Sequence, residues 1–301
     1  MVHLGDNLAV LRDCVPDSSI DLIYIDPPFN TGKTQTRTQI RTVADDDGDR
    51  TGFQSRRYRT SKLGTKSFAD EFDDYLGFLE PRLIEAHRVL ADHGTLYFHI
   101  DYREVHYTKI LLDSIFGREC FLNEVIWAYD YGARTTKRWP PKHDNILVYV
   151  KNPERYFFSV DEIERIPYLA PGLVGPEKAA RGKLPTDTWW NTIVPTNGSE
   201  RTGYPTQKPI AILKRIVQAS SRPDDVVLDF FAGSGTTGEA CHLLGRRFVL
   251  IDSNPVALCV MARRFAGIAG IQWSGFEPSP GGDTHAEDFA VLAALPPQQR
   301  P

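Results

Sequence analysis

The residues with the clearest chemical potential in this chain are Asp26, Pro27, Pro28 and Phe29. They follow the apolar run 21–25 (Asp-Leu-Ile-Tyr-Ile), which predicts a buried strand. Two successive prolines cannot continue a strand ladder or begin a helix cleanly, so the chain must leave the sheet in a stiff, extended turn. The turn offers a carboxylate, a carbonyl and an aromatic ring, a set that suits a flat heterocycle with an exocyclic amine. The simpler alternative is a proline-rich turn in which Asp26 is only a cap.

A glycine-rich motif lies between a second apolar run, 226–228, and a stretch of helical composition, 239–244. Its three glycines fit the spacing G-x-G-x-x-G, and an acid, Asp252, closes the next apolar run. Glycines let a backbone approach a ligand, the new helix directs unpaired N–H groups at it, and an acid in this place can accept the hydroxyls of a ribose. The pattern therefore makes a dinucleotide-binding site the first hypothesis for this loop.

The two motifs together resemble the beta group of DNA amino-methyltransferases, which use S-adenosylmethionine and carry the Asp-Pro-Pro-Phe element before the glycine motif. Further segments match where that group has them: 5–7 (Gly-Asp-Asn), 94–100, 142–151 and 204–209 (Tyr-Pro-Thr-Gln-Lys-Pro). The resemblance covers about residues 2–266. It implies an α/β fold: a doubly wound, mostly parallel, Rossmann-like methyltransferase sheet with an inserted target-recognition segment.

The resemblance implies transfer of a methyl group from S-adenosylmethionine to the N6 amine of an adenine flipped out of DNA. Asp26 and the Pro27 carbonyl would accept the amine's hydrogen bonds, and Phe29 would stack on the base. Adenine is favoured because Asp at the first position is typical of the family's adenine enzymes. Cytosine-N4 methylation, an NAD-dependent oxidoreductase and an inactive DNA-binding pseudo-methyltransferase stay open as alternatives. No Pro-Cys dipeptide occurs, which argues against cytosine C5 methylation, and no P-C-x-x-C occurs, which argues against a zinc deaminase.

The resemblance also implies the residues that bind the cofactor: Asp6, Asn7, Thr206, Lys208, Asp229, Phe230, Phe231, Ala232, Gly233, Ser234, Gly235, Thr236, Thr237, Asp252 and Ser253. Asp6 would bind the adenine amine of the cofactor, Asp252 its ribose, and the backbone of 232–237 its carboxylate end. Simpler roles remain for several of them. Asp6 and Asp252 can be helix caps, Thr206 an N-cap, and Lys208 a solvated charge.

The charge distribution bears on the DNA-binding prediction. The net charge is −4, but residues 33–66 contain nine basic and four acidic side chains. Residues 131–143 contain basic side chains and no acid. These stretches predict a positively charged DNA-binding face with Lys33, Arg37, Arg134, Lys137, Arg138 and Lys142, or else two solvated loops. Trp127 and Trp139 are expected in the core. The partner is double-stranded DNA; the resemblance also suggests a homodimer and a cognate restriction endonuclease.

Composition fits a soluble globular protein. Of 301 residues, 41% are hydrophobic and 25% charged, and no apolar run reaches transmembrane length. The four cysteines lack metal-binding spacing, so we expect free thiols, no metal site, and a cytoplasmic protein associated with the nucleoid through DNA.

Alternating apolar patterns predict the elements. Strands are expected at 2–4, 22–25, 95–100, 125–129, 146–150, 226–228 and 248–251. Helices are expected at 69–90 (restarting at Pro81 and ending near Gly94), 104–116, 210–220 and 255–265. The predicted parts are a catalytic half, 1–151, with a long basic loop, 33–68; a target-recognition insert, 152–203; a cofactor-binding half, 204–270; and a disordered tail, 271–301.

Overall fold

The computed structural model describes residues 1–30, 72, 74–132, 134–195 and 198–278, together with the backbone of three strands at 33–44, 50–51 and 57–70. The chain divides into two compact units, one formed by residues 1–27 and 76–301 and the other by residues 28–75. Among the described helices none has the length and apolar character needed to cross a membrane.

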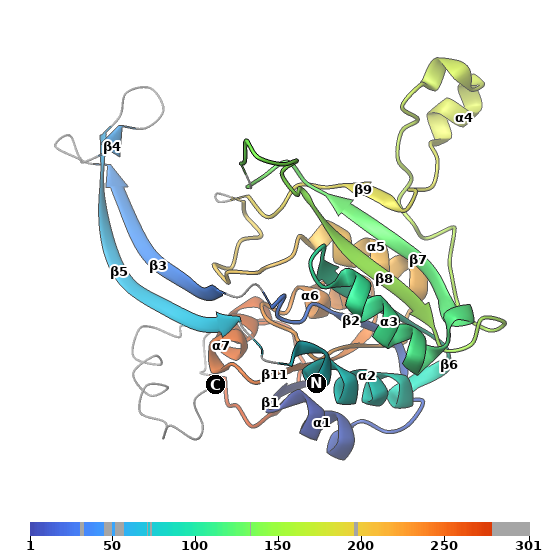
Figure 1. The fold of residues 1–301 in the computed structure, drawn as a ribbon, viewed down its shortest axis with the longest axis horizontal. Helices are drawn as coiled ribbons and strands as arrows, with labels where there is room; N and C mark the ends of the chain where they lie inside the picture. The colour runs from blue at the N-terminus through green and yellow to red at the C-terminus, as the bar shows by residue number, and fades with distance from the viewer. Residues whose placement is uncertain are drawn as a thin grey trace. The chain divides into compact units, whose positions relative to one another are not determined.

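The larger unit is built on a nine-stranded sheet in the order β12-β1-β11-β10-β2-β6-β8-β7-β9 (Figure 1). Its strands are β1 Val2–Leu4, β2 Ile20–Ile25, β6 Leu90–Asp101, β7 Phe121–Ala128, β8 His143–Val150, β9 Thr188–Trp190, β10 Val226–Asp229, β11 Arg247–Asp252 and β12 Trp273–Ser274. All neighbours pair in parallel except β8, which is antiparallel to β6 and to β7. The predicted mostly parallel α/β sheet is confirmed.

Helices cover both faces of this sheet, as expected for a parallel sheet whose strands are apolar on both sides (Figure 1). On one face, α5 (Ile210–Ser220) and α6 (Thr236–Leu243) pack on alternate residues of the central strands, including Leu22, Tyr24 and Val227. The helix α7 (Pro255–Arg264) continues this layer over Val2 and Leu250. The other face carries α1 (Asn7–Cys14), α2 (Tyr75–Val89) and α3 (Val105–Phe116).

The strand order places a set of polar residues along one edge of the sheet. The parallel strands β2, β10 and β11 end at Ile25, Asp229 and Asp252, so their carboxyl ends meet there. Because β8 is antiparallel, its first residues lie at the same edge, and Asp144 pairs with Asp101 at the end of β6. β2 and β10 are neighbours in the sheet, and the strand that follows each of them in the chain lies on opposite sides: β6 beside β2 and β11 beside β10. Ligands bind open α/β sheets at such a switch point.

The smaller unit is an antiparallel sheet, not the long loop expected at 33–68. It consists of β3 (Lys33–Ala44), β4 (Arg50–Thr51) and β5 (Arg57–Asp70), in the order β3-β5-β4. The register runs from the pair Lys33 and Asp70 to the pair Ala44 and Tyr58. β-branched residues at nearly every second position of β3 explain the strand, because such residues favour an extended backbone. The acidic run 45–49 lies outside the described residues.

The segment before β6 also differs from the expectation of a helix at 69–90. The helix α2 begins only at Tyr75 and continues through Pro81 without a restart. Proline costs a helix one N–H hydrogen bond, but burial of Leu79, Leu83 and Ala86 against the sheet holds the helix together. Gly94 is not at a helix end: it lies within β6, five residues after α2 stops at Val89.

Two segments that read as irregular contribute strands. Within 152–203, a short helix α4 (Pro176–Arg181) projects from the larger unit and β9 adds to the sheet beside β7 (Figure 1). Residues 271–278, which we expected to begin a disordered tail, carry β12; Trp273 and Phe276 pack with the cluster around Leu258. Residues 279–301 lie outside the described part of the chain.

Candidate functional site

Asp26 lies immediately after β2 and its two carboxylate oxygens have different surroundings. Lys208 donates a hydrogen bond from Nζ to Oδ2, and the two side chains are 12% and 14% exposed, Lys208 and Asp26 respectively. The other oxygen, Oδ1, is buried and has no hydrogen-bond donor among the described residues. Lys208 was predicted to bind the cofactor or to be a solvated charge; it is not solvated but pairs with Asp26, and its role toward the cofactor stays a prediction. Oδ1 of Asp26 is therefore available to accept a hydrogen bond from an N–H group of a ligand.

Behind Asp26 lies a buried hydrogen-bonded network that the sequence analysis missed. The Tyr24 hydroxyl is 2.8 Å from Nδ1 of His99, and Nε2 of His99 is 3.3 Å from Oδ2 of Asp144. Tyr129 donates from its hydroxyl to Oδ1 of Asp144 at 3.1 Å. His99 is 0% exposed, and its Nδ1 lies 3.9 Å from Oδ1 of Asp26. The sequence feature that could have indicated this network is a His and an Asp, His99 and Asp144, within two apolar strand segments.

Electrostatics fix the charge of two members of this network. Burial opposes ionisation of Asp144, but its hydrogen bond to His99, electrostatic attraction to His99 and to Lys208, and the Tyr129 hydroxyl outweigh burial and hold the pKa of Asp144 below its usual value. Burial and the charge of Asp26 raise the pKa of Tyr24 well above its usual value. Asp144 is therefore a carboxylate and Tyr24 a neutral phenol.

The glycine loop that follows β10 is braced by Asp229. Its carboxylate accepts from the Thr237 hydroxyl at 2.6 Å and from the backbone N–H of Phe231 at 3.0 Å. Burial raises the pKa of Asp229 to about 7, against the effect of these two hydrogen bonds. Asp229 and Thr237 therefore shape the loop, and Phe230 beside them is fully buried.

Two glycines of the loop have left-handed backbones that favour glycine. Gly233 has φ of +50°, and a Cβ there would come within 3.1 Å of the Tyr204 ring. Gly235 has φ of +73° and precedes the first residue of α6; a Cβ there would meet Met261 at 2.6 Å. The glycine spacing therefore serves tight packing of the loop against α7 and the 204–209 segment as well as any ligand. Ser234 and Thr236, on either side of Gly235, have their hydroxyls 2.9 Å apart.

Asp252 at the end of β11 holds the backbone of the same loop. Its Oδ2 accepts from the N–H of Gly233 at 2.7 Å, and its Oδ1 accepts from the N–H of Asn254 at 2.8 Å. Asn254, not Asp252, is the N-cap of α7. Burial raises the pKa of Asp252 to about 6, despite these two hydrogen bonds. Each oxygen retains a second acceptor position, so this carboxylate suits a ligand that brings hydroxyl donors.

Asp6 and Asn7 have local structural partners. Asp6 is the N-cap of α1, accepting from the Ala9 N–H at 3.1 Å, and also accepts from Arg82 at 3.0 Å. Asn7 is buried, donates to the Phe230 carbonyl at 2.8 Å and accepts from Arg82 at 2.6 Å. The cap role foreseen for Asp6 is therefore observed, and Asn7 ties α1 to the glycine loop.

The remaining predicted cofactor residues are less enclosed. Thr206 and Ser253 are exposed, and Phe231 is partly buried with its ring 6.1 Å from that of Phe78. Thr206 is not an N-cap, because α5 begins at Ile210 with Pro209 in the cap position. Ala232 is buried and bonds through its N–H to the Ile251 carbonyl.

Pro28 and Phe29 belong to the smaller unit. There the Pro28 carbonyl accepts from the Tyr75 hydroxyl at 2.6 Å, and the side chain of Asn30 accepts from the Phe72 N–H at 3.1 Å. These bonds close the two ends of the unit on each other. The contribution of Phe29 to the site stays a prediction.

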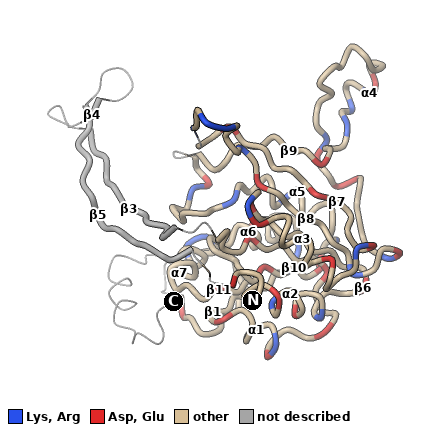
Figure 2. The backbone as a smooth tube through the Cα atoms, in the orientation of Figure 1, with Lys and Arg blue, Asp and Glu red and all other residues tan. Residues whose placement is uncertain are grey.

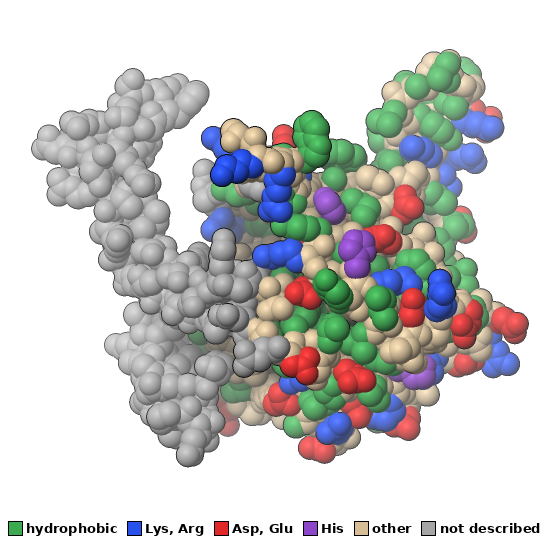
Figure 3. Space-filling model, viewed as in Figure 1, with side chains coloured by type: hydrophobic (Ala, Val, Ile, Leu, Met, Phe, Trp, Pro, Cys, Tyr) green, Lys and Arg blue, Asp and Glu red, His purple; other side chains and the backbone are tan. Residues whose placement is uncertain are grey.

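The loop that joins β7 to β8 gathers basic side chains at the same edge of the sheet (Figures 2 and 3). Arg134, Lys137 and Arg138 are exposed, and Lys142 is partly buried with Nζ 3.3 Å from the Asp130 carbonyl oxygen. Trp127 lies in the core as expected, but Trp139 does not: its side chain is 94% exposed on this loop. Lys33 and Arg37 lie in β3, and their side chains lie outside the described residues.

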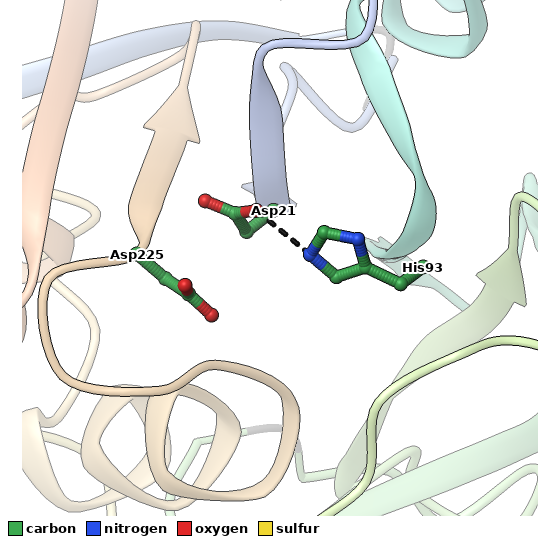
Figure 4. A group of neighbouring side chains, drawn as sticks. All are labelled: Asp21, His93 and Asp225. Atoms are coloured by element: carbon green, nitrogen blue, oxygen red, sulfur yellow. Dashed lines mark hydrogen bonds and ion pairs between the residues drawn. The ribbon is translucent and has the colours of Figure 1, made fainter.

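At the opposite edge of the sheet, Asp21, His93 and Asp225 gather residue types that can ligate a metal (Figure 4). Their ligand atoms lie within 4.8 Å of one another. Both carboxylates already have partners: Asp21 bonds His93 at 2.8 Å and accepts from the Val226 N–H at 2.7 Å, and Asp225 accepts from the Arg222 N–H at 2.7 Å. These bonds tie together the starts of β2, β6 and β10, which is a sufficient structural role.

Comparison with known proteins identifies the family. The sequence model of the N6/N4 methyltransferases, described as DNA methylase, matches residues 20–262. Type II methyltransferase M.HpaI of Haemophilus parainfluenzae is 33% identical over 238 residues, which are 79% of this chain and 65% of M.HpaI. The chain thus spans just under two thirds of that relative. DNA adenine methyltransferase YhdJ of Escherichia coli (strain K12) is 30% identical over 277 residues, 88% of this chain and 81% of YhdJ.

Solved structures share the fold. The complex of M1.HpyAVI with SAM has a TM-score of 0.54 at 18% identity and covers 88% of this chain and 98% of that one. The PvuII DNA methyltransferase (cytosine-N4-specific) has a TM-score of 0.60 at 15% identity and covers 88% of this chain and 85% of that one. The match over 243 residues and the identity to YhdJ set aside the oxidoreductase alternative and confirm the resemblance. The chain belongs to the N6/N4 family of DNA methylases.

Proposed function

We propose that this protein transfers a methyl group from S-adenosylmethionine to the N6 amine of an adenine flipped out of duplex DNA. The observation that carries the proposal is the pair of unlike oxygens on Asp26. Lys208 fixes Oδ2 and leaves Oδ1 buried without a donor among the described residues. A buried acceptor of this kind gains a hydrogen bond when an amine N–H arrives, so the site is organised before the base binds.

The reaction requires activation of a weak nucleophile. The lone pair of an aromatic amine is delocalised into the ring, and hydrogen bonds from its N–H groups to Asp26 and the Pro27 carbonyl favour a more pyramidal nitrogen. A base can reach Asp26 only outside the double helix. Stacking of the base on Phe29 stays a prediction from the 26–29 motif. Tyr24, His99 and Asp144 are buried on the side of Asp26 that faces the sheet, and this packing excludes water from that side.

The glycine loop and Asp252 fit the cofactor. Asp252 is a partly buried carboxylate with its pKa raised to about 6, so hydroxyl donors from a ribose would stabilise its charged form. The loop 232–237, held by Asp229 and Asp252, leads into α6, whose N-terminal N–H groups suit a carboxylate. S-adenosylmethionine supplies an electrophilic methyl group when bound. Four further residues remain proposed cofactor-binding residues with less structural support: Asp6, Thr206, Lys208 and Ser253.

Adenine is favoured over cytosine for two reasons. Asp occupies the first position of the 26–29 motif, and the relative YhdJ is named as a DNA adenine methyltransferase. Cytosine-N4 methylation is the second candidate, since the PvuII enzyme, which shares the fold, is named as cytosine-N4-specific.

DNA is proposed to lie over the β7–β8 loop, whose charge is positive and whose base adjoins Asp144. The segment 152–203 is proposed to read the target sequence. The family suggests two further partners, a second copy of the chain and a restriction endonuclease of the same specificity. The nucleoid is the proposed cellular site of action.

The test is a methyl-transfer assay with labelled S-adenosylmethionine and mixed-sequence duplex DNA, followed by digestion to nucleosides and mass spectrometry. We expect N6-methyladenine from the wild-type protein. In Asp26→Ala, loss of an acceptor used in the transition state should lower single-turnover methylation by at least about a hundredfold. Binding of S-adenosylhomocysteine should hardly change.

Three other results of this assay would each decide against the proposal or a part of it. N4-methylcytosine as the product would assign the second candidate. Labelled DNA at the wild-type rate in Asp26→Ala would remove Asp26 from catalysis. DNA binding without any methylated product, on DNA that contains all short sequences, would assign the pseudo-methyltransferase.

A further inference from the structure

Trp139 is 94% exposed, more than any other described Phe, Tyr or Trp residue, and methyl transfer at Asp26 gives it no direct role. A tryptophan usually buries most of its large apolar surface, which is why the sequence predicted this one in the core. A single exposed apolar residue needs no explanation by itself. Trp139 differs from such a residue in its charged neighbours, its restrained backbone and its position relative to Asp26.

The neighbours of Trp139 are positively charged. Arg134, Lys137 and Arg138 are exposed on the same β7–β8 loop, where Lys and Arg side chains gather (Figure 3). The stretch 131–143 contains no acid. A loop with this charge is attracted to the phosphates of DNA, and phosphate contacts fix the position of a protein on the duplex. The charge of the loop therefore favours DNA as the surface that the indole meets.

The backbone that carries Trp139 is restrained. Pro140 and Pro141 follow it directly, and a proline restricts both its own φ and the conformation of the residue before it. On the other side of Trp139, Arg138 donates to the Tyr102 hydroxyl at 3.3 Å. A restrained loop loses little conformational entropy on binding, so it can insert a side chain without first being ordered.

The base of the loop lies close to Asp26. The Tyr129 N–H donates to the Lys142 carbonyl at 2.9 Å where the loop closes. The strand β8, which begins there, is separated from β2 only by β6, so β8 and β2 run about 10 Å apart, twice the spacing of neighbouring strands. The loop and the Asp26 turn can therefore act on the same base pair.

Removal of a base from a duplex leaves a gap between the adjoining base pairs. Unpairing and unstacking the base costs free energy, and this cost opposes base flipping. Proteins that distort DNA frequently insert an apolar side chain between base steps. An indole suits such a gap because it is broad and flat and stacks on bases of every type.

We propose that Trp139 enters the DNA stack and fills the gap that the target base leaves when it turns out toward Asp26. The inference deepens the proposed function and rests on it: Asp26 binds the base outside the helix, and Trp139 stabilises the helix without that base. The three basic side chains hold the loop on the flanking phosphates. The indole replaces part of the stacking that the flipped base loses.

The experiment measures single-turnover methylation, below saturation, of a duplex with the target sequence, which is identified by mapping the methylated product. We expect Trp139→Ala to lower the rate about tenfold to a hundredfold, the range for one lost stacking contact. Trp139→Phe keeps a ring that stacks and should retain most of the rate. The melting temperature and the affinity for S-adenosylhomocysteine should not change in either variant, because Trp139 is exposed.

A chemical replacement for the indole separates this role from others. In a second duplex a pyrene nucleotide lies opposite the target base; pyrene fills the space of a base pair, so the target base is held out of the stack and no gap remains for Trp139. On this duplex the wild type and Trp139→Ala should have rates within about threefold of each other.

Two controls accompany these duplexes. Changing Arg134, Lys137 and Arg138 to Ala should lower the rate on both duplexes, since the phosphate contacts are lost on both. Leu243→Ala removes an apolar side chain that is 59% exposed at the last residue of α6, the end remote from the glycine loop. It should match the wild type on both duplexes.

The outcomes are distinct. A wild-type rate for Trp139→Ala on the ordinary duplex would overturn the proposal. So would a defect that persists on the pyrene duplex; with an altered sedimentation coefficient, that result would assign Trp139 to an interface with a second copy of the chain. If the wild-type protein methylates no DNA, the proposed function fails, and this inference fails with it. If the wild type methylates DNA and needs Asp26 but not Trp139, only the present inference fails.

Discussion

At the residue scale, Asp26 and Asp252 show how two strand ends at the same edge of the sheet, with β10 between them, hold carboxylates in different surroundings. Asp26 has one oxygen fixed by Lys208 and one without a donor among the described residues, whereas both oxygens of Asp252 hold backbone N–H groups. The first arrangement suits a group that bonds a reacting amine. The second suits a group that shapes a loop and adds bonds to a ligand's hydroxyls.

This difference predicts how cofactor binding responds to mutation. Asp252→Ala loses charge-assisted hydrogen bonds to the ribose and the anchor of Gly233, about 1.5–3 kcal/mol or roughly tenfold to a hundredfold in affinity. Gly233→Val places a branched side chain on a backbone with φ of +50° and against Tyr204. Calorimetric titration with S-adenosylhomocysteine should show both losses. Normal binding by both folded variants would mean that the loop has only a structural role.

Burial of Asp229 and Asp252 also predicts a pH effect on stability. Their pKa values are raised to about 7 and about 6, mainly by burial, so the folded state holds these protons more tightly than the unfolded chain. Their contribution to stability is then fully present below about pH 4 and is lost as pH rises through about 6 to 7. Melting temperatures of the ligand-free protein and of Asp229→Asn and Asp252→Asn, measured from pH 5 to 8, should show a smaller downward slope in each variant.

Cofactor binding should respond with the opposite sign, because ribose hydroxyls bond the carboxylate form of Asp252. The affinity for S-adenosylhomocysteine should rise from pH 5 to 7 in the wild type and less so in Asp252→Asn. Equal slopes in the two proteins would show that Asp252 does not titrate in this range or does not meet the ligand.

At the element scale, the β7–β8 loop links the DNA surface to the buried network. Tyr129, the first residue after β7, bonds Asp144 of β8 at the base of the loop, and Arg138 donates to the Tyr102 hydroxyl at 3.3 Å. The loop therefore lies at the sheet edge where Asp26, Asp229 and Asp252 meet, with exposed Trp139 among its basic residues. An exposed indole beside arginines suits stacking on bases as well as phosphate contact.

The loop predicts a specific change in salt dependence. Changing Arg134, Lys137 and Arg138 to Ala should weaken DNA binding across sequences. It should also reduce the slope of log affinity against log salt by up to about three units, near 0.9 per lost phosphate contact. A matched triple change at the opposite sheet edge, Arg155, Arg222 and Arg247 to Ala, should leave the slope unchanged. If the loop instead lies between two copies of the chain, the triple variant will change its sedimentation coefficient while keeping its salt slope.

At the scale of the whole molecule, the sequence predicts the parallel sheet because its strands are buried on both faces. Near-continuous apolar runs such as 22–25 and 95–100 stand out against helices with one apolar face. The acids that follow these runs then meet at one edge by topology alone. Asp26, Asp229 and Asp252 were predicted from the two motifs and from the family that they resemble, and the structure brings them to one edge of the sheet.

What the sequence did not predict depends on contacts between distant segments. The pairing of Lys208 with Asp26 joins residues 182 positions apart, and His99 meets Tyr24 and Asp144 across three strands. The strands β3 and β5 were missed because their many charged and threonine residues lack the apolar alternation of a half-buried strand. Pro81 was taken as a break because propensity alone ignores the packing that keeps α2 intact.

The division into two units predicts that the smaller one can be shortened without loss of the larger fold. The first residue of β3, Lys33, pairs with the last residue of β5, Asp70, so a short glycine-serine linker can replace residues 33–70. Because the nine-stranded sheet contains no strand from this region, the melting temperature and the affinity for S-adenosylhomocysteine should change little. DNA affinity and its salt slope should fall, because the replacement removes all nine basic residues at 33–66, which outnumber the four acidic ones there. Changing Arg37, Arg41, Lys62 and Lys66 to Gln in the full-length chain separates the effect of charge from the effect of losing the segment, and should reproduce part of the change in salt slope.

Two outcomes would contradict these expectations. A shortened protein that loses cofactor binding would show that the smaller unit supports the cofactor site. A shortened protein that binds DNA with an unchanged salt slope would show that the 33–66 segment does not contact DNA.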